Sequence, residues 1–124
     1  MIKKVKVFNF TSNNMILDEA EIADSFNLRL KGLLGRSSLA PGKGLIIRPC
    51  RSVHTMGMQF PIDIAFVDNE DRICHIIKNM RPYKISPCIN KSSYIIEAPS
   101  GTFTSTSTAV GDKVKLEGKQ KSEA

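Results

Sequence analysis

The feature that most constrains this chain is a series of short apolar runs separated by turn residues. The clearest case is segment 62–77, in which two strand-like runs flank the turn Asn69-Glu70-Asp71. This pattern is typical of an antiparallel hairpin. Residues 2–10 alternate lysine with apolar side chains, as expected of a strand with one face in water. Both observations indicate a protein built mainly from β-strands.

The turn signals divide the chain into about seven expected strands, at residues 2–10, 15–22, 45–47, 62–68, 72–77, 93–97 and 113–116. One short helix is expected from Asp24 or Ser25 to Gly35, because the apolar residues between them recur at helical spacing and glycine commonly ends a helix. These elements predict a compact antiparallel β-sandwich or barrel rather than a parallel βαβ fold. Segment 102–108, rich in threonine and serine, is expected to form a polar loop or an edge strand.

The length of 124 residues predicts one domain over residues 1–116, followed by a frayed tail over 117–124 that lacks large apolar side chains. A membrane-spanning helix is not expected, because no run of about 18 apolar residues occurs. The first residues lack the apolar core of a secretory signal peptide, so a cytoplasmic location is expected. The three cysteines form no paired motif, which indicates free thiols and no disulfide.

Asp63 is the most informative polar residue of the expected strands. It shares one strand face with Ala65 and Val67, where an unpaired carboxylate is energetically expensive. Arg29 and Arg36 are natural partners, because a guanidinium group can donate two parallel hydrogen bonds to a carboxylate. We expect a structural ion pair between helix and sheet rather than a catalytic acid, although the same group could also form the edge of a pocket.

Two stretches of the chain resemble a known family. Residues 29–36, in which two arginines flank Gly-Leu-Leu, are similar to its helix motif. Residues 60–68, in which Pro and Asp precede an apolar run that ends in Asp, are similar to its strand motif, and Glu97, Gly101 and Gly111-Asp112 resemble its closing pattern. Over about residues 23–116 the chain therefore resembles the domain of unknown function 192 family, in a branch with His-Thr-Met-Gly-Met at residues 54–58.

The resemblance implies a compact, mainly β domain, in agreement with the periodicity. It implies no particular activity, because this family has no established biochemical function. Many relatives are exported, and some accompany surface or pilus machinery, so the resemblance implies a protein partner of that kind.

Positive charge gathers in the helix motif at residues 29–36 and in the loop before the signature strand. Because loops carry binding sites more often than cores do, we expect a cationic surface site there, supported from behind by Asp63. The leading hypothesis is a non-enzymatic accessory or ligand-binding domain for an anionic small molecule, glycan or protein partner, and the alternative is an ordinary solvated basic rim. The expected binding residues are Arg29, Arg36, Arg51, His54, Thr55 and Asp63.

Two other classes of function remain as alternatives. A small enzyme could use a thiolate at Cys50 with an imidazole at His54, although a four-residue spacing in a loop fixes no geometry and free cysteines are often buried. Nucleic-acid binding ranks third, because the positive charge is spread along the chain and aromatic residues make up only 6%, with no Trp. No metal or other cofactor is expected, since adjacent Cys74 and His75 point to opposite faces of a strand and no paired ligand motif occurs.

Overall fold

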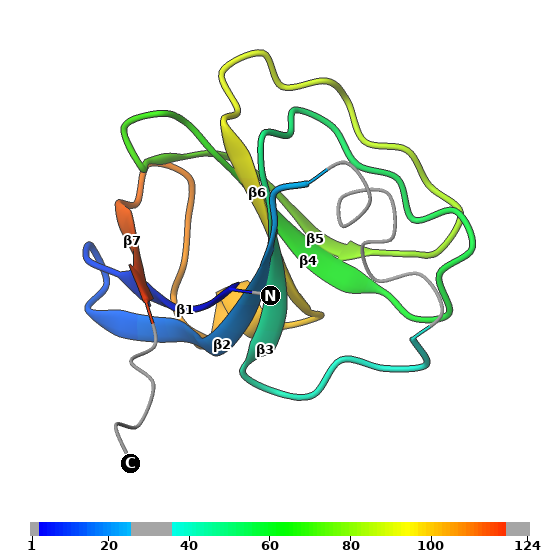
Figure 1. Cartoon of the computed structure of the whole chain (residues 1–124), viewed down its shortest axis with the longest axis horizontal. Helices are drawn as coiled ribbons and strands as arrows, with labels where there is room; N and C mark the ends of the chain where they lie inside the picture. The colour runs from blue at the N-terminus through cyan, green and yellow to red at the C-terminus, as the bar shows by residue number, and fades with distance from the viewer. Residues whose placement is uncertain (1–2, 26–35, 119–124) are drawn as a thin grey trace.

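The computed structural model describes residues 3–25 and 36–118 and has a mainly β architecture, as expected (Figure 1). The expected helix lies almost entirely within residues 26–35, outside the described residues. In the described part of the chain, no helix is long and apolar enough to cross a membrane. The elements are β1 (Lys3–Asn9), β2 (Asn14–Ala23), β3 (Lys43–Ile47), β4 (Ile62–Val67), β5 (Ile73–Met80), β6 (Tyr94–Pro99), α2 (Thr102–Ser105) and β7 (Val114–Gly118).

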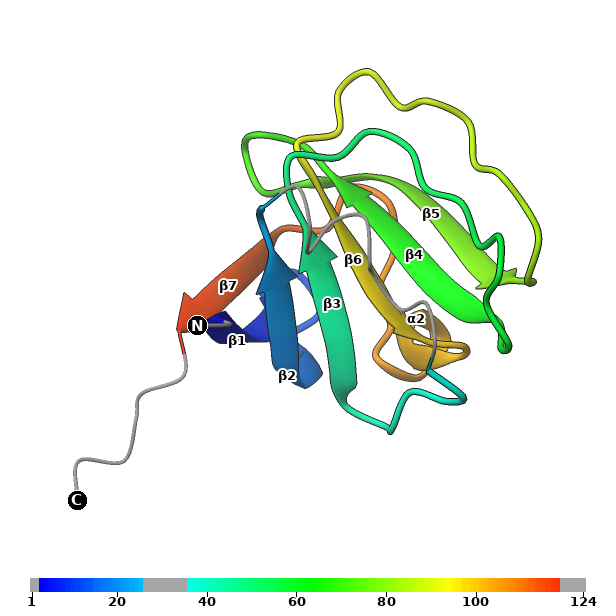
Figure 2. The same ribbon diagram turned by 45° about the vertical axis from the view of Figure 1, so that its right-hand side comes forward.

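The strands form one curled sheet in the order β5-β4-β6-β3-β2-β1-β7, which resembles half of a barrel (Figures 1 and 2). Its edge strands approach each other at one end, where the Ile73 amide donates to the Asp112 carbonyl at 2.9 Å and the Gly111 amide donates to the Ile73 carbonyl at 2.8 Å. Neighbouring strands are antiparallel except for β2 and β3, which are parallel. The β2–β3 pair thus departs from the antiparallel arrangement that we expected, and the connection over residues 24–42 is long enough for a parallel crossover.

The two faces of the sheet contribute to two separate apolar cores, as the alternation in the sequence predicts. In β4, Ile62, Ile64 and Phe66 belong to one core, whereas Ala65 and Val67 belong to the other. We call the core with Ala65 and Val67 the first core and the core with Ile62, Ile64 and Phe66 the second core. The first core is filled mainly from β1, β2, β4 and β6.

Two long loops cover the second core, and we call residues 48–61 and 81–93 together the loop layer. Figure 1 shows the two loops running side by side. Backbone amides link them: Ile89 donates to the Arg51 carbonyl and Ser86 to the Val53 carbonyl, both at 2.8 Å. Val53 and Met58 point into the second core, so the loop layer takes the place of a second sheet.

Two boundaries differ from the sequence-based expectations. Segment 102–108 begins with the single helical turn of α2 rather than a polar loop or edge strand, because Phe103 is fully buried in the first core. Strand β7 extends to Gly118, two residues into the expected tail, since Glu117 and Gly118 pair with Lys6 and Val5 of β1. Backbone pairing holds this segment without any large apolar side chain, and residues 119–124 lie outside the described structure.

Candidate functional site

Asp63 is fully buried, and its carboxylate is held by backbone amides. The Asn79 amide donates to Oδ1 at 2.9 Å, and the Gly101 and Phe103 amides at the start of α2 each donate to Oδ2 at 3.1 Å. The expected pairing of Asp63 with Arg36 is therefore wrong, and Arg29 lies outside the described residues. Amides at the start of a helical turn have no partner within the helix, so they satisfy a buried carboxylate as an arginine would.

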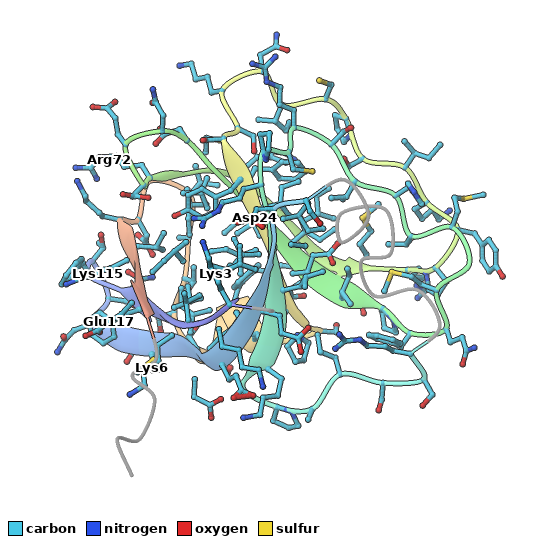
Figure 3. All side chains as sticks on the ribbon, viewed as in Figure 1. Lys3, Lys6, Asp24, Arg72, Lys115 and Glu117 are labelled. Atoms are coloured by element: carbon cyan, nitrogen blue, oxygen red, sulfur yellow. The ribbon has the colours of Figure 1, made fainter. Side chains whose placement is uncertain are left out.

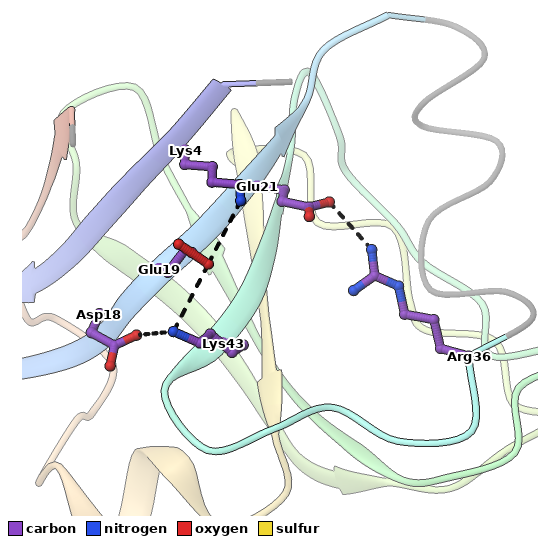
Figure 4. Close-up of polar contacts among 6 residues, drawn as sticks. All are labelled: Lys4, Asp18, Glu19, Glu21, Arg36 and Lys43. Carbon is purple, nitrogen blue, oxygen red and sulfur yellow. Dashed lines mark hydrogen bonds and ion pairs between the residues drawn. The ribbon is translucent and has the colours of Figure 1, made fainter. Parts of the chain in front are cut away.

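Arg36 instead forms an ion pair with Glu21 of β2, at 3.2 Å between Nη2 and Oε2. Figure 4 shows the Arg36 side chain extending from the loop before β3 toward the Glu21 carboxylate. Neighbouring Lys43 pairs with Asp18 at 3.1 Å and with Glu19 at 3.8 Å. The structure thus places the cation at position 36 in an ion pair with the sheet.

Glu97 of β6 is a buried carboxyl that the sequence pattern did not single out as a titrating group. It lies opposite Leu45 of β3 and Ile64 of β4, and it is only 4% exposed. Its Oε1 has no hydrogen-bond partner among the described residues. Burial raises the pKa of Glu97 to about 7, while the positive charge of Arg36 opposes that rise. In the sequence, the signal for this group was a carboxyl side chain in the middle of an otherwise apolar strand.

Thr55 joins the two halves of the loop layer. It is fully buried, and its Oγ1 donates to the Arg81 carbonyl at 2.6 Å and accepts from the Lys84 amide at 2.9 Å. Its own amide donates to the Lys84 carbonyl at 2.8 Å, and its carbonyl accepts from the Tyr83 amide at 2.9 Å. This expected binding residue therefore holds the loops that carry the surface, and its hydroxyl does not lie on that surface.

Cys50 and His54 both make local hydrogen bonds within their loop. The Cys50 thiol donates to the Ser52 carbonyl at 3.0 Å, and His54 Nδ1 accepts from the Met56 amide at 3.2 Å. The cysteines at positions 50, 74 and 88 form no disulfide, as expected. The described chain contains no group of three His, Cys, Asp or Glu side chains placed to hold a metal ion.

The loop layer has an unusual charge. Its two segments contain five Lys or Arg residues and no Asp or Glu, so they account for five of the six net positive charges of the chain. Arg48 pairs with Asp24 at 3.8 Å. The ion pairs of the described chain involve none of the other four cations, which are Arg51, Arg81, Lys84 and Lys91. All four are exposed, and His54 is exposed beside them.

Exposed apolar side chains lie among these cations. Met56 is 45% exposed, Tyr83 65% and Ile85 76%. They lie on the linked parts of the loops, where His54 and Ile85 form a β-bridge. Of the lysines labelled in Figure 3, Lys6 of β1 and Lys115 of β7 lie at the end of the molecule opposite the loop layer. The combination of cations and apolar groups defines the candidate site, and we call these residues of the loop layer its outer surface.

One end of the loop layer also borders a hollow of about 560 Å³. Its walls are Pro49 and Arg51, the β4–β5 turn at residues 68–70, and residues 90–93. Of the expected binding residues that the structure describes, Arg51 lines this hollow, whereas Arg36 reaches Glu21 and Asp63 lies beneath α2. The cations of residues 81–93 were missed because sequence reasoning stayed with the family motifs, although the absence of acidic residues there was visible.

Comparison with known proteins gives the same fold and a family. The DUF192 family, described as an uncharacterized ACR, matches residues 8–116. The UPF0127 protein PH1112 of Pyrococcus horikoshii is 32% identical over 112 residues, which cover 88% of this chain and 96% of that protein.

Two crystal structures resemble the chain over most of its length. A protein of unknown function from Novosphingobium aromaticivorans has a TM-score of 0.78 and 26% identity, covering 92% of this chain and 84% of its own. A protein from Sinorhizobium meliloti, described as a candidate transcription regulator, has a TM-score of 0.79 and covers 94% of both chains, but at 20% identity it shows the fold alone. With a family match that spans most of its residues, the chain belongs to the DUF192 family of uncharacterised proteins.

Proposed function

We propose that the protein is a non-enzymatic binding domain whose loop layer docks an acidic segment of a partner protein. The observation that carries this proposal is the composition of the outer surface. The two loops carry three exposed apolar side chains, an exposed histidine and four cations that take part in none of the ion pairs of the described residues, and they contain no carboxylate.

The chemistry of this surface favours a protein partner over a purely ionic ligand. Cations at the rim of an interface speed association and select against positively charged partners, whereas buried apolar contacts supply most of the affinity. Tyr83 and Ile85, the most exposed large apolar residues of the loop layer, need a partner with apolar side chains of its own. An acidic segment with interspersed apolar residues supplies both.

The loops are held in place before any partner arrives. Backbone hydrogen bonds and the Thr55 hydroxyl link them at several points. Docking on a surface that is already ordered avoids much of the conformational entropy cost of binding. Within this proposal Arg51 and His54 contribute to the outer surface, and Asp63 and Thr55 stabilise the framework behind it.

The proposal is tested with a fluorescein-labelled peptide of about 12 residues that alternates Glu with Leu or Phe, the size class of short docking motifs. We expect saturable binding that weakens with added salt. Changing Arg81→Glu and Lys84→Glu together should weaken binding by about tenfold or more, because two rim cations become repulsive. Fluorescence anisotropy measures both effects.

Two controls make the result specific. Lys6→Glu on β1 changes the charge of an exposed lysine at the opposite end of the molecule and should leave binding unchanged. A peptide with Lys in place of Glu should not bind. Absence of binding to the acidic peptide, or equal weakening by Lys6→Glu, would contradict the proposal, as would binding of single-stranded RNA or anionic vesicles that outcompetes the peptide.

A further inference from the structure

The hollow at the end of the loop layer differs in charge from the outer surface. The loops contribute Arg51 and Lys91 to its walls, whereas the β4–β5 turn contributes Asp68 and Glu70. Two positively charged and two negatively charged residues thus line the same space. None of the ion pairs in the described structure joins these four residues, so opposite charges are held around the hollow without neutralising one another.

The walls of the hollow are ordered by internal hydrogen bonds. On the loop side, buried Ser92 donates its hydroxyl to the Cys50 carbonyl at 2.8 Å, and the Ser93 amide donates to the Val67 carbonyl at 2.7 Å. On the turn side, Asp68 Oδ1 accepts from the amides of Glu70 at 2.9 Å and Arg72 at 3.0 Å. The separation between the two charged walls is therefore set by the fold.

The size and lining of the hollow restrict the class of ligand. About 560 Å³ is within the usual range for small-molecule sites. The side chains of Asn69 and Asn90 add amide donors and acceptors, and the described lining residues include no aromatic ring on which a base could stack. A simple anion would meet two carboxylates and a simple cation would meet two cations, so the hollow suits a ligand that carries both charges.

We propose that this hollow binds a short peptide through its free ammonium and carboxylate groups. Arg51 and Lys91 hold the carboxylate, and Asp68 and Glu70 hold the ammonium group. A free amino acid shares this chemistry but spans less of the space between the walls. This proposal shares Arg51 and Lys91 with the docking of an acidic segment, but it also depends on Asp68 and Glu70, which belong to the β4–β5 turn and not to the outer surface.

The test is an NMR titration of the full ¹⁵N-labelled chain with L-alanyl-L-alanine. We expect shift changes at residues 51, 68–70 and 90–93. The N-acetylated and the C-amidated dipeptides should each bind about tenfold more weakly, since each has lost one charged group. L-Alanine should also bind more weakly than the dipeptide, and equal affinity would assign the site to free amino acids.

Two exposed wall residues separate the two halves of the interaction. Glu70→Gln should weaken binding of the free dipeptide but not of its N-acetylated form, and Arg51→Gln should weaken binding of the free dipeptide but not of its C-amidated form. Lys6→Gln, far from the hollow, should change nothing. The variant Arg81→Glu with Lys84→Glu, which tests the outer surface, should bind the dipeptide normally, because neither residue lines the hollow.

The outcomes that overturn the proposal are also specific. If the N-acetylated dipeptide binds as well as the free one, the hollow is only an anion site. If the C-amidated form binds as well, it is only a cation site. If the free dipeptide causes no shift changes at about 50 mM, above the range of weak specific binding, the hollow has no such ligand.

Discussion

At the scale of single residues, Asp63 shows how a buried charge is satisfied in this fold. Changing Asp63→Asn should lower the free energy of unfolding by about 2–3 kcal/mol, because an amide group cannot accept hydrogen bonds from three backbone donors on both of its ends. Urea denaturation measures this change. Asp18→Asn, at an exposed carboxylate paired with Lys43, is the matched control and should cost less than about 1 kcal/mol. Equal effects of the two substitutions would contradict the role assigned to Asp63.

The buried carboxyl group of Glu97 leads to a prediction about how the stability of the folded protein depends on pH. Its pKa of about 7 in the folded protein is above its ordinary value of 4.5, because burial disfavours the charged form. Between pH 4.5 and about 7, the folded state therefore holds a proton that the unfolded state has released. The stability that this group contributes is fully present below pH 4.5 and is lost as the pH rises through about 7. Glu97→Gln should remove this loss, stabilising the protein by roughly 3 kcal/mol at pH 8 and much less at pH 5.

Urea denaturation at the two pH values tests this prediction. Glu117→Gln, at an exposed carboxylate of β7, provides the control and should show no comparable difference between pH 5 and pH 8. A Glu97→Gln variant whose stability relative to the unchanged protein is the same at both pH values would show that Glu97 titrates normally.

At the scale of elements, the loop layer depends on one hydroxyl group. Thr55→Val should lower the free energy of unfolding by about 2 kcal/mol, because the Arg81 carbonyl and the Lys84 amide lose the hydroxyl group that they share. Thr55→Ser keeps the hydroxyl and should cost less than about 1 kcal/mol. Hydrogen exchange locates the effect: the Lys84 amide should exchange faster in the valine variant, while the amides of β4 stay protected. Unchanged protection at Lys84 would argue against this link.

The strand boundaries show where local patterns were sufficient. Alternation and turn residues were enough to predict β1, β2 and the β4–β5 hairpin. Gly44 precedes the expected strand at residues 45–47 but lies in β3, where an added side chain would collide with the Glu97 carbonyl and with Leu17. The burial of Phe103 in α2 could not be predicted either, because a single apolar residue among threonines and serines shows no periodicity.

At the scale of the whole molecule, charge is distributed unevenly. The net charge of +6 is almost entirely contributed by the loop layer, and the remaining residues are close to balance. The two loops are separated in the sequence by the β4–β5 hairpin, which turns the chain back and brings residues 48–61 beside residues 81–93. The expected pairing of Arg36 with Asp63 was wrong for another reason: the sequence motifs do not specify which carboxylate a long side chain reaches, and Arg36 reaches Glu21.

The amino-acid sequence by itself determined the family, the mainly β architecture and the two faces of the central strands. These features depend on local periodicity and on burial, and both are recorded in the order of apolar and polar residues. Only the tertiary structure decided that backbone amides satisfy Asp63, that Oε1 of Glu97 has no hydrogen-bond partner among the described residues, and that opposite charges share one hollow. The hydrogen bonds to Asp63 come from backbone amides, which almost every residue has, so no pattern of side chains predicts them. The surroundings of Glu97 and of the hollow depend on which distant segments the fold brings together.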